Sequence, residues 1–309
     1  MSDPGVPTFD QLKIFLAVVE SGSFAGAGRK LNRAVSVISY GVANLEAQLG
    51  IELFDRETTR RPRLTEAGHA VLAEARTVAQ GVDGLRARVK GMRDGLEAEV
   101  HLAVDVMLPA ARLGEVLRSF SEQFPTVSLR LSVEGLGAVM GLVMDRRAAL
   151  GISGPLPAEK EEIERIAAGA VTMIPVAAPG HPLARSGDLA PGAGRDHVQL
   201  VLTDRSELTQ GRDFGVVGRR TWRLADLGAK HALLREGIGW GNMPLCMVEA
   251  DLASGALVRL VMPDRPAIAY RLWAIYRRDR PPGPAASWLL RQFVERGAGD
   301  AAVAGSTDI

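Results

Sequence analysis

Residues 17–56, AVVESGSFAGAGRKLNRAVSVISYGVANLEAQLGIELFDR, contain the most informative helix and turn signals in the first part of the chain. Upstream of these residues, Thr8 and Gln11 have the spacing of a capping box and predict the start of a helix. Ser21-Gly22 is expected to end that helix, and Ser23 has the short polar side chain that caps the next one. The stretch therefore opens with two helices separated by a short break.

A third helix is predicted after a break at Asn32-Arg33, because apolar residues then recur at helical spacing until Gly50. These apolar residues are Ile38, Val42, Leu45 and Leu49. Three short helices, the last two joined by a tight turn, fit the helix-turn-helix arrangement, whose second helix enters a major groove. Spacing alone fits an ordinary helical bundle equally well, so it does not establish DNA binding.

The residues themselves carry a more specific signal. Residues 17–56, followed by RPRLTEAG at 61–68, closely resemble the N-terminal DNA-binding domain of LysR-type transcriptional regulators. The shared features are the Gly-Ser-Phe entry at 22–24, the small-residue second helix, Ser39, Leu45-Glu46, Leu49-Gly50, Leu53-Phe54-Asp55-Arg56 and Leu64-Thr65-Glu66-Ala67-Gly68. The resemblance implies a winged helix-turn-helix domain over residues 1–66, with the wing at 53–64.

The third helix departs from the family pattern on the face that would read DNA. Many relatives begin it with Ser-Gln-Pro-Ala, where this chain has Ala-Val-Ser-Val at 34–37, and common arginines are replaced by Tyr40 and Ala43. No Lys or Arg lies between Ala34 and Leu49, so bidentate arginine-to-guanine contacts from this helix are excluded. We therefore expect DNA shape to contribute more to specificity. The predicted reading residues are Ala34, Ser36, Val37, Ser39, Tyr40, Ala43 and Asn44, with Ser23 at the start of the second helix.

Phosphate contacts are expected from a cluster of seven cations, which faces four acidic residues between positions 29 and 63, a local charge of +3. The cations are Arg29, Lys30, Arg33, Arg56, Arg60, Arg61 and Arg63. Each phosphate contact would release counterions and make affinity fall with salt. A charge run by itself is usually a solvated face, so this assignment depends on the helix-turn-helix resemblance.

A linker helix over residues 67–95 is predicted to pair with a second copy. Apolar residues alternate spacings of four and three along it, as in a heptad seam. They are Val71, Ala75, Val78, Val82, Leu85, Val89 and Met92. The alternative is a single helix packed on its own domain. LysR-type regulators dimerise through this helix, so the resemblance implies a homodimer that assembles further to a tetramer and binds two-fold related half-sites in double-stranded DNA.

Residues 96–298 alternate strand-like and helix-like segments and predict an α/β unit with a mostly parallel sheet covered by helices on both faces. Strands are expected at 99–105, 127–133, 149–153, 198–202, 238–240, 257–261 and 268–276, and helices at 109–124, 136–145, 227–235, 245–253 and 288–294. The series pauses near Met173-Ile174-Pro175. The Gly- and Ala-rich tail, 299–309, is expected to be disordered.

The same unit resembles, more weakly, the LysR effector domain, itself similar to periplasmic solute receptors, through the segments at 120–131, 177–184, 237–244 and 251–260. The fold class is thus α+β multidomain, with one lobe at 96–172 and 268–296 and another at 173–267. An unidentified small-molecule effector would bind between them, at carboxyl ends of strands. The predicted contacts are Asp105, Val106, Met107, Glu134, Ser153, Thr203, Asp204, Arg205, Trp240 and Asn242. Because Asp105 and Met107 replace the Ser or Thr common in carboxylate-binding relatives, we hypothesise a neutral, cationic or aromatic effector.

An α/β enzyme and a free-standing solute receptor are the two alternative classes of protein for this chain. The sequence has no HExxH, Walker or G-x-S-x-G motif and no Cys/His metal spacing, so it predicts neither catalysis nor a metal or cofactor. A solute receptor would need a signal peptide, which is not visible. Cys246, the single cysteine, is expected to be a buried small side chain. The chain is predicted to be cytoplasmic, with no membrane partner, and RNA polymerase is a further candidate partner.

Overall fold

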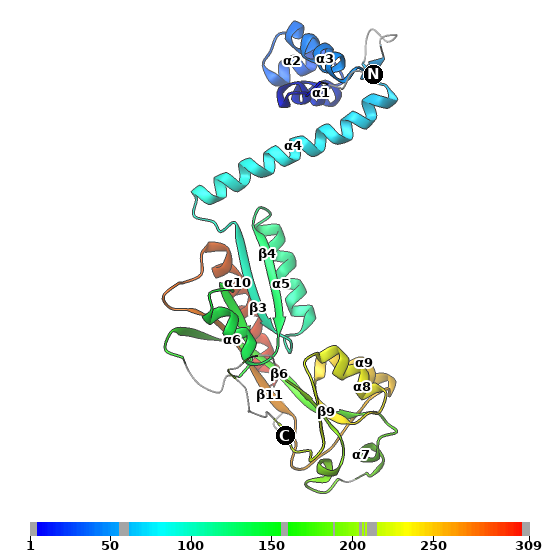
Figure 1. The fold of residues 1–309 in the computed structure, drawn as a ribbon, viewed down its shortest axis with the longest axis vertical. Coiled ribbons are helices and arrows are strands. Elements are labelled where there is room, and N and C mark those ends of the chain that lie inside the picture. Colours follow the sequence, from blue (N-terminus) through cyan, green and yellow to red (C-terminus); the bar gives the residue numbers. More distant parts are fainter. Residues whose placement is uncertain are drawn as a thin grey trace. The chain divides into compact units, whose positions relative to one another are not determined.

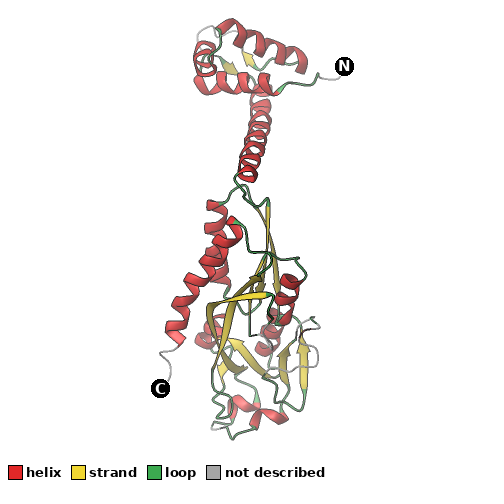
Figure 2. Ribbon diagram, turned by 90° about the vertical axis from the view of Figure 1, so that its left-hand side faces the viewer, coloured by secondary structure: helices red, strands yellow, loops and turns green. Residues whose placement is uncertain are grey.

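The computed structural model describes residues 5–55, 62–155, 160–187, 189–203, 206, 208 and 215–304. The chain forms two compact units, residues 1–90 and 91–309 (Figure 1). The first unit is helical, and the second combines a large sheet with helices (Figure 2). None of the helices in the described part of the chain combines the length and hydrophobicity needed to cross a bilayer.

The first unit is built from three helices and a small two-stranded wing. Its elements are α1 (Phe9–Ser21), α2 (Phe24–Leu31), α3 (Val35–Leu49), the antiparallel pair β1 (Phe54–Asp55) and β2 (Arg63–Leu64), and most of α4 (Glu66–Arg93). The capping box predicted at Thr8 and Gln11 is confirmed, and so is the Ser23 cap, whose hydroxyl accepts from Gly26 N at 3.0 Å. The apolar stripe of α3 packs inward: Ile38 and Leu45 are fully buried.

Hydrogen bonds and one tight glycine contact fix the position of the wing relative to α3 and α4. The Glu46 carboxylate accepts hydrogen bonds from Leu53 N at 2.7 Å and Phe54 N at 3.2 Å, which ties the end of α3 to β1. At the start of α4, Thr65 Oγ1 accepts from Gly68 N at 2.9 Å. A Cβ on Gly68 would lie 2.2 Å from Leu53 O, so any side chain there would push α4 off the wing. The Thr-Glu-Ala-Gly motif thus positions the linker helix.

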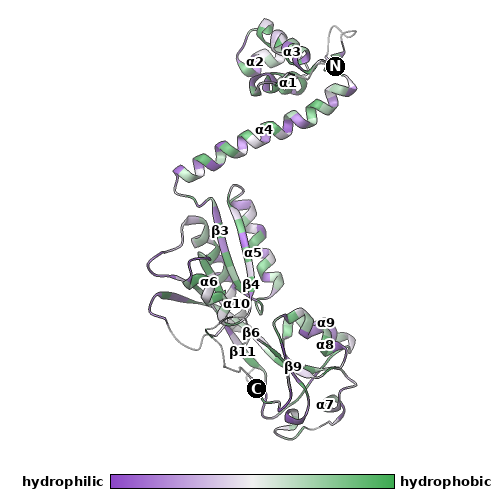
Figure 3. Cartoon of the chain, in the orientation of Figure 1, coloured by the Kyte–Doolittle hydropathy of each residue, from purple (hydrophilic) through white to green (hydrophobic). Residues whose placement is uncertain are grey.

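Helix α4 changes character along its length. Leu72 and Ala75, near its start, are buried against the three-helix bundle. Beyond them the apolar seam emerges into solvent: Val78 is 44% exposed, Leu85 61% and Val89 47%. Figure 3 shows apolar and polar residues alternating along this helix. A helix of 28 residues is about 42 Å long, so its second half carries apolar side chains that the bundle does not cover.

The second unit contains a nine-stranded mixed sheet with strand order β4-β3-β5-β11-β6-β9-β7-β8, and β10 pairs with β6. The strands are β3 (Glu99–Asp105), β4 (Ser128–Glu134), β5 (Leu150–Ser153), β6 (Ile163–Ala177), β7 (Gln199–Leu202), β8 (Thr221–Leu224), β9 (Trp240–Pro244), β10 (Val258–Arg259) and β11 (Ile268–Arg277). The helices are α5 (Ala110–Gln123), α6 (Gly137–Met144), α7 (Pro182–Arg185), α8 (Leu227–Arg235), α9 (Leu245–Ser254) and α10 (Pro284–Ala304), with a 3₁₀ turn at Ala193–Asp196.

Two long antiparallel strands connect the parallel parts of this sheet. β3 lies parallel to β4 and β5, and β7 lies parallel to β8 and β9, whereas β6 is antiparallel to both β11 and β9. Ile268 pairs with Met173 at the end of the β6–β11 ladder, and Met173 also begins the β6–β9 ladder. β6 therefore runs from one half of the unit into the other.

Several sequence predictions for this unit were wrong. The pause expected near 173–175 is the end of β6, a 15-residue strand that contains Pro175, and the exposed strand β8 was not predicted. The strand expected at 238–240 begins at Trp240 instead. Helix α10 begins at Pro284 and ends at Ala304, so it is longer than the helix expected at 288–294 and overlaps the predicted tail, of which 305–309 lie outside the described part. Cys246 is exposed on α9 and not buried.

Candidate functional site

The outward face of α3 consists of small and aromatic side chains. Its opposite face is buried through Ile38, Val42 and Leu45, which fixes the orientation of the helix. Tyr40 is 69% exposed and Val37 is 46% exposed, although both are apolar or aromatic. Of the predicted reading residues, Ala34, Ser36, Val37, Ser39, Tyr40 and Ala43 are exposed, Asn44 is half-buried, and Ser23 is half-buried at the start of α2. The structure thus gathers most of them on one solvent-facing surface.

Two of the predicted phosphate-binding cations already have carboxylate partners. The Arg33 guanidinium donates two hydrogen bonds to Asp10, at 2.6 and 2.9 Å, and Lys30 pairs with Glu20. The Arg33 hydrogen bond lowers the pKa of Asp10 below its ordinary value. These pairs join the turn and α2 to α1. Arg29 and Arg63 are exposed, whereas Arg56, Arg60 and Arg61 lie outside the described residues.

The first group of predicted effector contacts meets at one edge of the sheet. Asp105, Glu134 and Ser153 are the last residues of β3, β4 and β5, and the parallel register places Asp105 directly opposite Glu134. Val106 N donates to Glu134 O at 2.8 Å. Met107 and Ser153 are buried, whereas Val106 and Glu134 are half-buried. The carboxyl ends of these strands therefore form one polar edge, as the topology argument predicts.

Asp105 is the most constrained of these groups. Its side chain is buried and accepts hydrogen bonds from Met107 N at 2.9 Å, Gly154 N at 3.2 Å and the Tyr270 hydroxyl at 2.9 Å. Burial raises its pKa to about 6, although these donors act in the opposite direction. Because three donors already occupy the carboxylate, Asp105 does not indicate the charge of an effector.

The predicted effector contacts from the second half of the sheet differ in how deeply they are buried. Thr203 follows β7 and is half-buried, as is Asn242 on β9, while Asp204 and Arg205 lie outside the described residues. Trp240 is fully buried, packs with Leu183 and Met262, and donates from Nε1 to Gly194 O at 3.0 Å. This packing argues against the predicted contact of Trp240 with an effector.

Sequence reasoning missed two polar side chains of this unit. Tyr270, from β11, reaches Asp105 and so joins a connecting strand to the end of β3. Lys230 on α8 is buried, donates to Asn242 O at 2.7 Å, and has a pKa lowered by burial to about 8. Its spacing from Leu227 and Leu234 places it on the inward face of α8, which the helical period alone could have indicated. Within the described ranges, no group of three His, Cys, Asp or Glu is placed to hold a metal ion.

Both units match known protein-family profiles. Residues 9–69 match the bacterial regulatory helix-turn-helix protein, LysR family, and residues 93–298 match the LysR substrate binding domain. The chain belongs to the LysR family. It is a LysR-type transcriptional regulator with a helix-turn-helix DNA-binding domain and a C-terminal effector-binding domain. The resemblance inferred from the sequence is thereby confirmed.

This LysR-type regulator aligns with known transcriptional regulators over nearly their whole length. The HTH-type transcriptional activator AllS of Klebsiella pneumoniae is 28% identical over 254 residues, covering 81% of this chain and 93% of AllS. The probable HTH-type transcriptional regulator YhaJ of Escherichia coli is 25% identical over 289 residues, 93% of this chain and 95% of YhaJ.

Solved full-length structures share the fold of this regulator. The Corynebacterium glutamicum OxyR C206 mutant aligns with a TM-score of 0.53 at 21% identity, over 100% of this chain and 98% of OxyR. LysG from the same organism, solved with its bound effector Arg, aligns with a TM-score of 0.52 at 22% identity, over 94% of this chain and 98% of LysG.

Proposed function

We propose that this regulator acts in the cytoplasm as a dimer, or a tetramer of two dimers, that reads two-fold related half-sites through α3. The observation that carries the proposal is the outward face of α3, where Tyr40 is 69% exposed beside exposed Ser36 and Val37. Large apolar side chains on one solvent-facing helix surface favour a surface that contacts a partner. In the sequence, cations precede α3 at Arg29, Lys30 and Arg33 and follow it at Arg63.

The reading mode that we propose uses no arginine from α3. Ser36, Tyr40 and Asn44 would hydrogen-bond to base edges, and Ala34 and Val37 would contact thymine methyl groups. Arg29 and Arg63, both exposed, would bind phosphates together with Arg56, Arg60 and Arg61. Lys30 and Arg33 would have to exchange a carboxylate partner for a phosphate, so we expect them to contribute less.

We propose that two copies pair through the seam of α4. Val78, Leu85 and Val89 are all at least 44% exposed in the single chain and recur at heptad spacing. Pairing would cover these side chains and supply the second reading helix that a two-fold related site requires.

We propose that a small-molecule effector binds at the carboxyl edge of β3, β4 and β5, facing Thr203 and Asn242 from the other lobe. Support comes from the half-buried Val106 and Glu134 at this edge. The effector would favour one arrangement of the lobes and so bias DNA binding.

We propose three domains, a DNA-binding domain at 1–66, a linker helix at 67–95 and an effector-binding domain at 96–298. We propose a regulatory and not an enzymatic role, with RNA polymerase as a partner at the promoter.

The assignment of the reading face is tested by replacing Tyr40 with Ala. We expect the ratio of operator to non-specific DNA affinity to fall about tenfold, because one lost base contact costs about 1–3 kcal/mol of discrimination. Replacing Arg63 with Ala should instead weaken binding to all sequences. It should also reduce the slope of the logarithm of the affinity against the logarithm of the salt concentration by about one. Fluorescence anisotropy on an operator selected from random DNA measures both. Unchanged selectivity in Tyr40→Ala would place the reading face elsewhere.

A further inference from the structure

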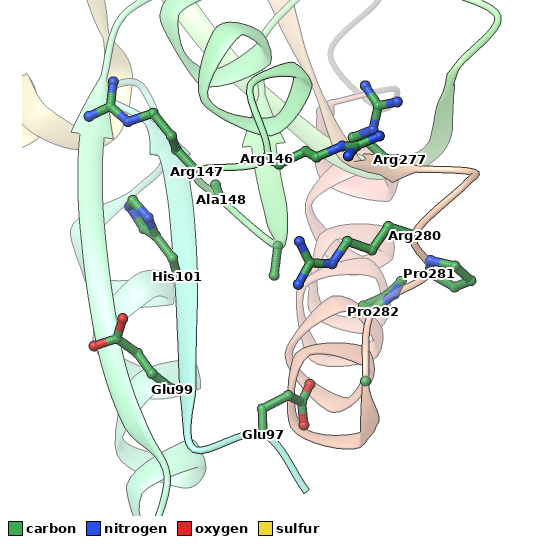
Figure 4. A pocket seen from close by; sticks show the side chains of 12 residues that line it. Glu97, Glu99, His101, Arg146, Arg147, Ala148, Arg277, Arg280, Pro281 and Pro282 are labelled. Carbon is green, nitrogen blue, oxygen red and sulfur yellow. The ribbon is translucent and has the colours of Figure 1, made fainter. Parts of the chain in front are cut away.

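A pocket of about 440 Å³ lies in the second unit, away from the strand ends that carry the proposed effector contacts. It is formed by the start of β3, the α6–β5 connection and the β11–α10 connection (Figure 4). Asp105 ends β3 at its other extremity, about 20 Å away for a seven-residue strand. The pocket is therefore separate from the carboxyl edge of the sheet, and its volume is within the range of small-molecule sites.

Arginines dominate the charged side chains of this pocket. Four arginines line it, Arg146, Arg147, Arg277 and Arg280, against two glutamates, Glu97 and Glu99. Figure 4 shows Arg280 extending from the β11–α10 connection into the space between the other lining elements, whereas the Arg147 side chain extends toward the strands at the upper left, with its guanidinium directed away from that of Arg280. Guanidinium groups present paired N–H donors that match carboxylate and phosphate oxygens.

The carboxylates near the pocket are already engaged. Both oxygens of Glu97 accept backbone hydrogen bonds at the start of α10, from Ala285 N at 3.0 Å and Ala286 N at 3.1 Å. Glu99 pairs with Arg130 at 3.6 Å. The charge of Glu97 is thus stabilised by the helix N-terminus, and that of Glu99 by a cation outside the pocket.

The arginines fall into two pairs with different surroundings. Arg277 and Arg146 share Asp279: Arg277 donates to it at 2.7 and 2.8 Å, and Arg146 donates at 3.1 Å. Arg147 and Arg280 have no ion pair among the residues that the structure describes. Two guanidinium groups that line one pocket therefore remain available to an anion.

We propose that this pocket is a second ligand site of the effector domain, and that it binds a small anion with at least two carboxylate or phosphate groups. Arg280 and Arg147 would hold the charged groups, while Pro281 and Pro282 wall the space beside Arg280. A single charged group would satisfy only one of the two guanidinium groups, which favours a polyvalent anion. The site is independent of the DNA-reading face and of the proposed effector edge.

Calorimetric titration of the full-length protein at low ionic strength tests this site, with citrate as the carboxylate probe and pyrophosphate as the phosphate probe. We expect at least one probe to bind with one site per chain, and the probe that binds more tightly identifies the preferred group. Its dissociation constant should rise about tenfold in Arg280→Ala and further in the Arg147→Ala/Arg280→Ala variant, because charge-assisted hydrogen bonds are lost. Added salt should weaken it.

The matched control is Arg118→Ala, which removes an exposed arginine of α5 that does not line the pocket. Its affinity for the probe should equal that of the native protein. The proposal is overturned if neither probe binds more tightly than about 1 mM, or if the double variant binds the probe as well as the native protein does. The second outcome would assign the anion to another surface, such as the carboxyl edge of the sheet.

Discussion

Replacing Leu85 with Glu is expected to convert the proposed dimer into a monomer and to weaken operator binding by about a hundredfold or more. Leu85 is 61% exposed at the centre of the α4 seam. In a paired helix its two copies would face each other, so two carboxylates would enter an apolar interface without partners. Loss of the second reading helix removes the gain from binding two half-sites, which ranges over about 10²–10⁴ in effective affinity.

The matched control for this variant is Ala87→Glu. Ala87 lies on the same helix and is exposed, but it is off the seam. It introduces the same charge and should leave both the dimer and the operator affinity unchanged. Sedimentation velocity gives the oligomeric state, and fluorescence anisotropy gives the affinity. A dimeric Leu85→Glu protein with native affinity would show that α4 does not pair through this seam.

Asp105 is expected to make the effector domain less stable as the pH rises from 4 to 7. Its pKa is about 6 in the folded chain against an ordinary value of 3.8, so the native state binds this proton more tightly than the unfolded state. The destabilisation is absent below pH 3.8, grows between pH 3.8 and 6, and is complete above pH 6. A difference of this size corresponds to about 3 kcal/mol in the free energy of unfolding.

The measurement is denaturant unfolding of the native protein and of Asp105→Asn across this pH range. Asn has no carboxyl group to titrate, so the difference between the two free energies isolates Asp105. The free energy of unfolding of the native protein, relative to that of Asp105→Asn, should fall by about 2 kcal/mol between pH 4 and pH 7, because a small part of the destabilisation is already present at pH 4. Asp10 and Asp279, whose pKa values are lowered by Arg33 and Arg277, titrate equally in both proteins and cancel. A difference that stays flat with pH would mean that the three donors keep Asp105 ionised throughout.

The sequence predicted local structure well where a backbone group has a local partner. Thr8, Ser23 and Gly50 stand at helix ends because their side chains or backbones satisfy hydrogen bonds within a few residues. The helical period predicts which apolar residues of α3 face inward, and the remaining residues are then predicted to face solvent. These features need no knowledge of distant parts of the chain.

Features that depend on distant strands were not predictable. β6 contains Gly169 and Pro175, which are unfavourable in a strand. Pro175 pairs with Asn242 of β9, and Gly169, with a φ of 94°, lies where the register between β6 and β11 shifts. Trp240 is predicted from its position near a strand end as an effector contact, but it begins β9 and packs into the core. The Asp105–Tyr270 contact joins residues 165 positions apart, and no local pattern encodes it.

Genome-wide footprinting of the DNA bound by the full-length protein, with and without candidate metabolites, tests whether α3 reads specific DNA and whether a small molecule in the effector domain controls this reading. We expect a limited set of footprints that share a two-fold related sequence, and at least one metabolite that changes their extent or occupancy. Binding without shared sites, or footprints that no metabolite alters, would contradict this mechanism.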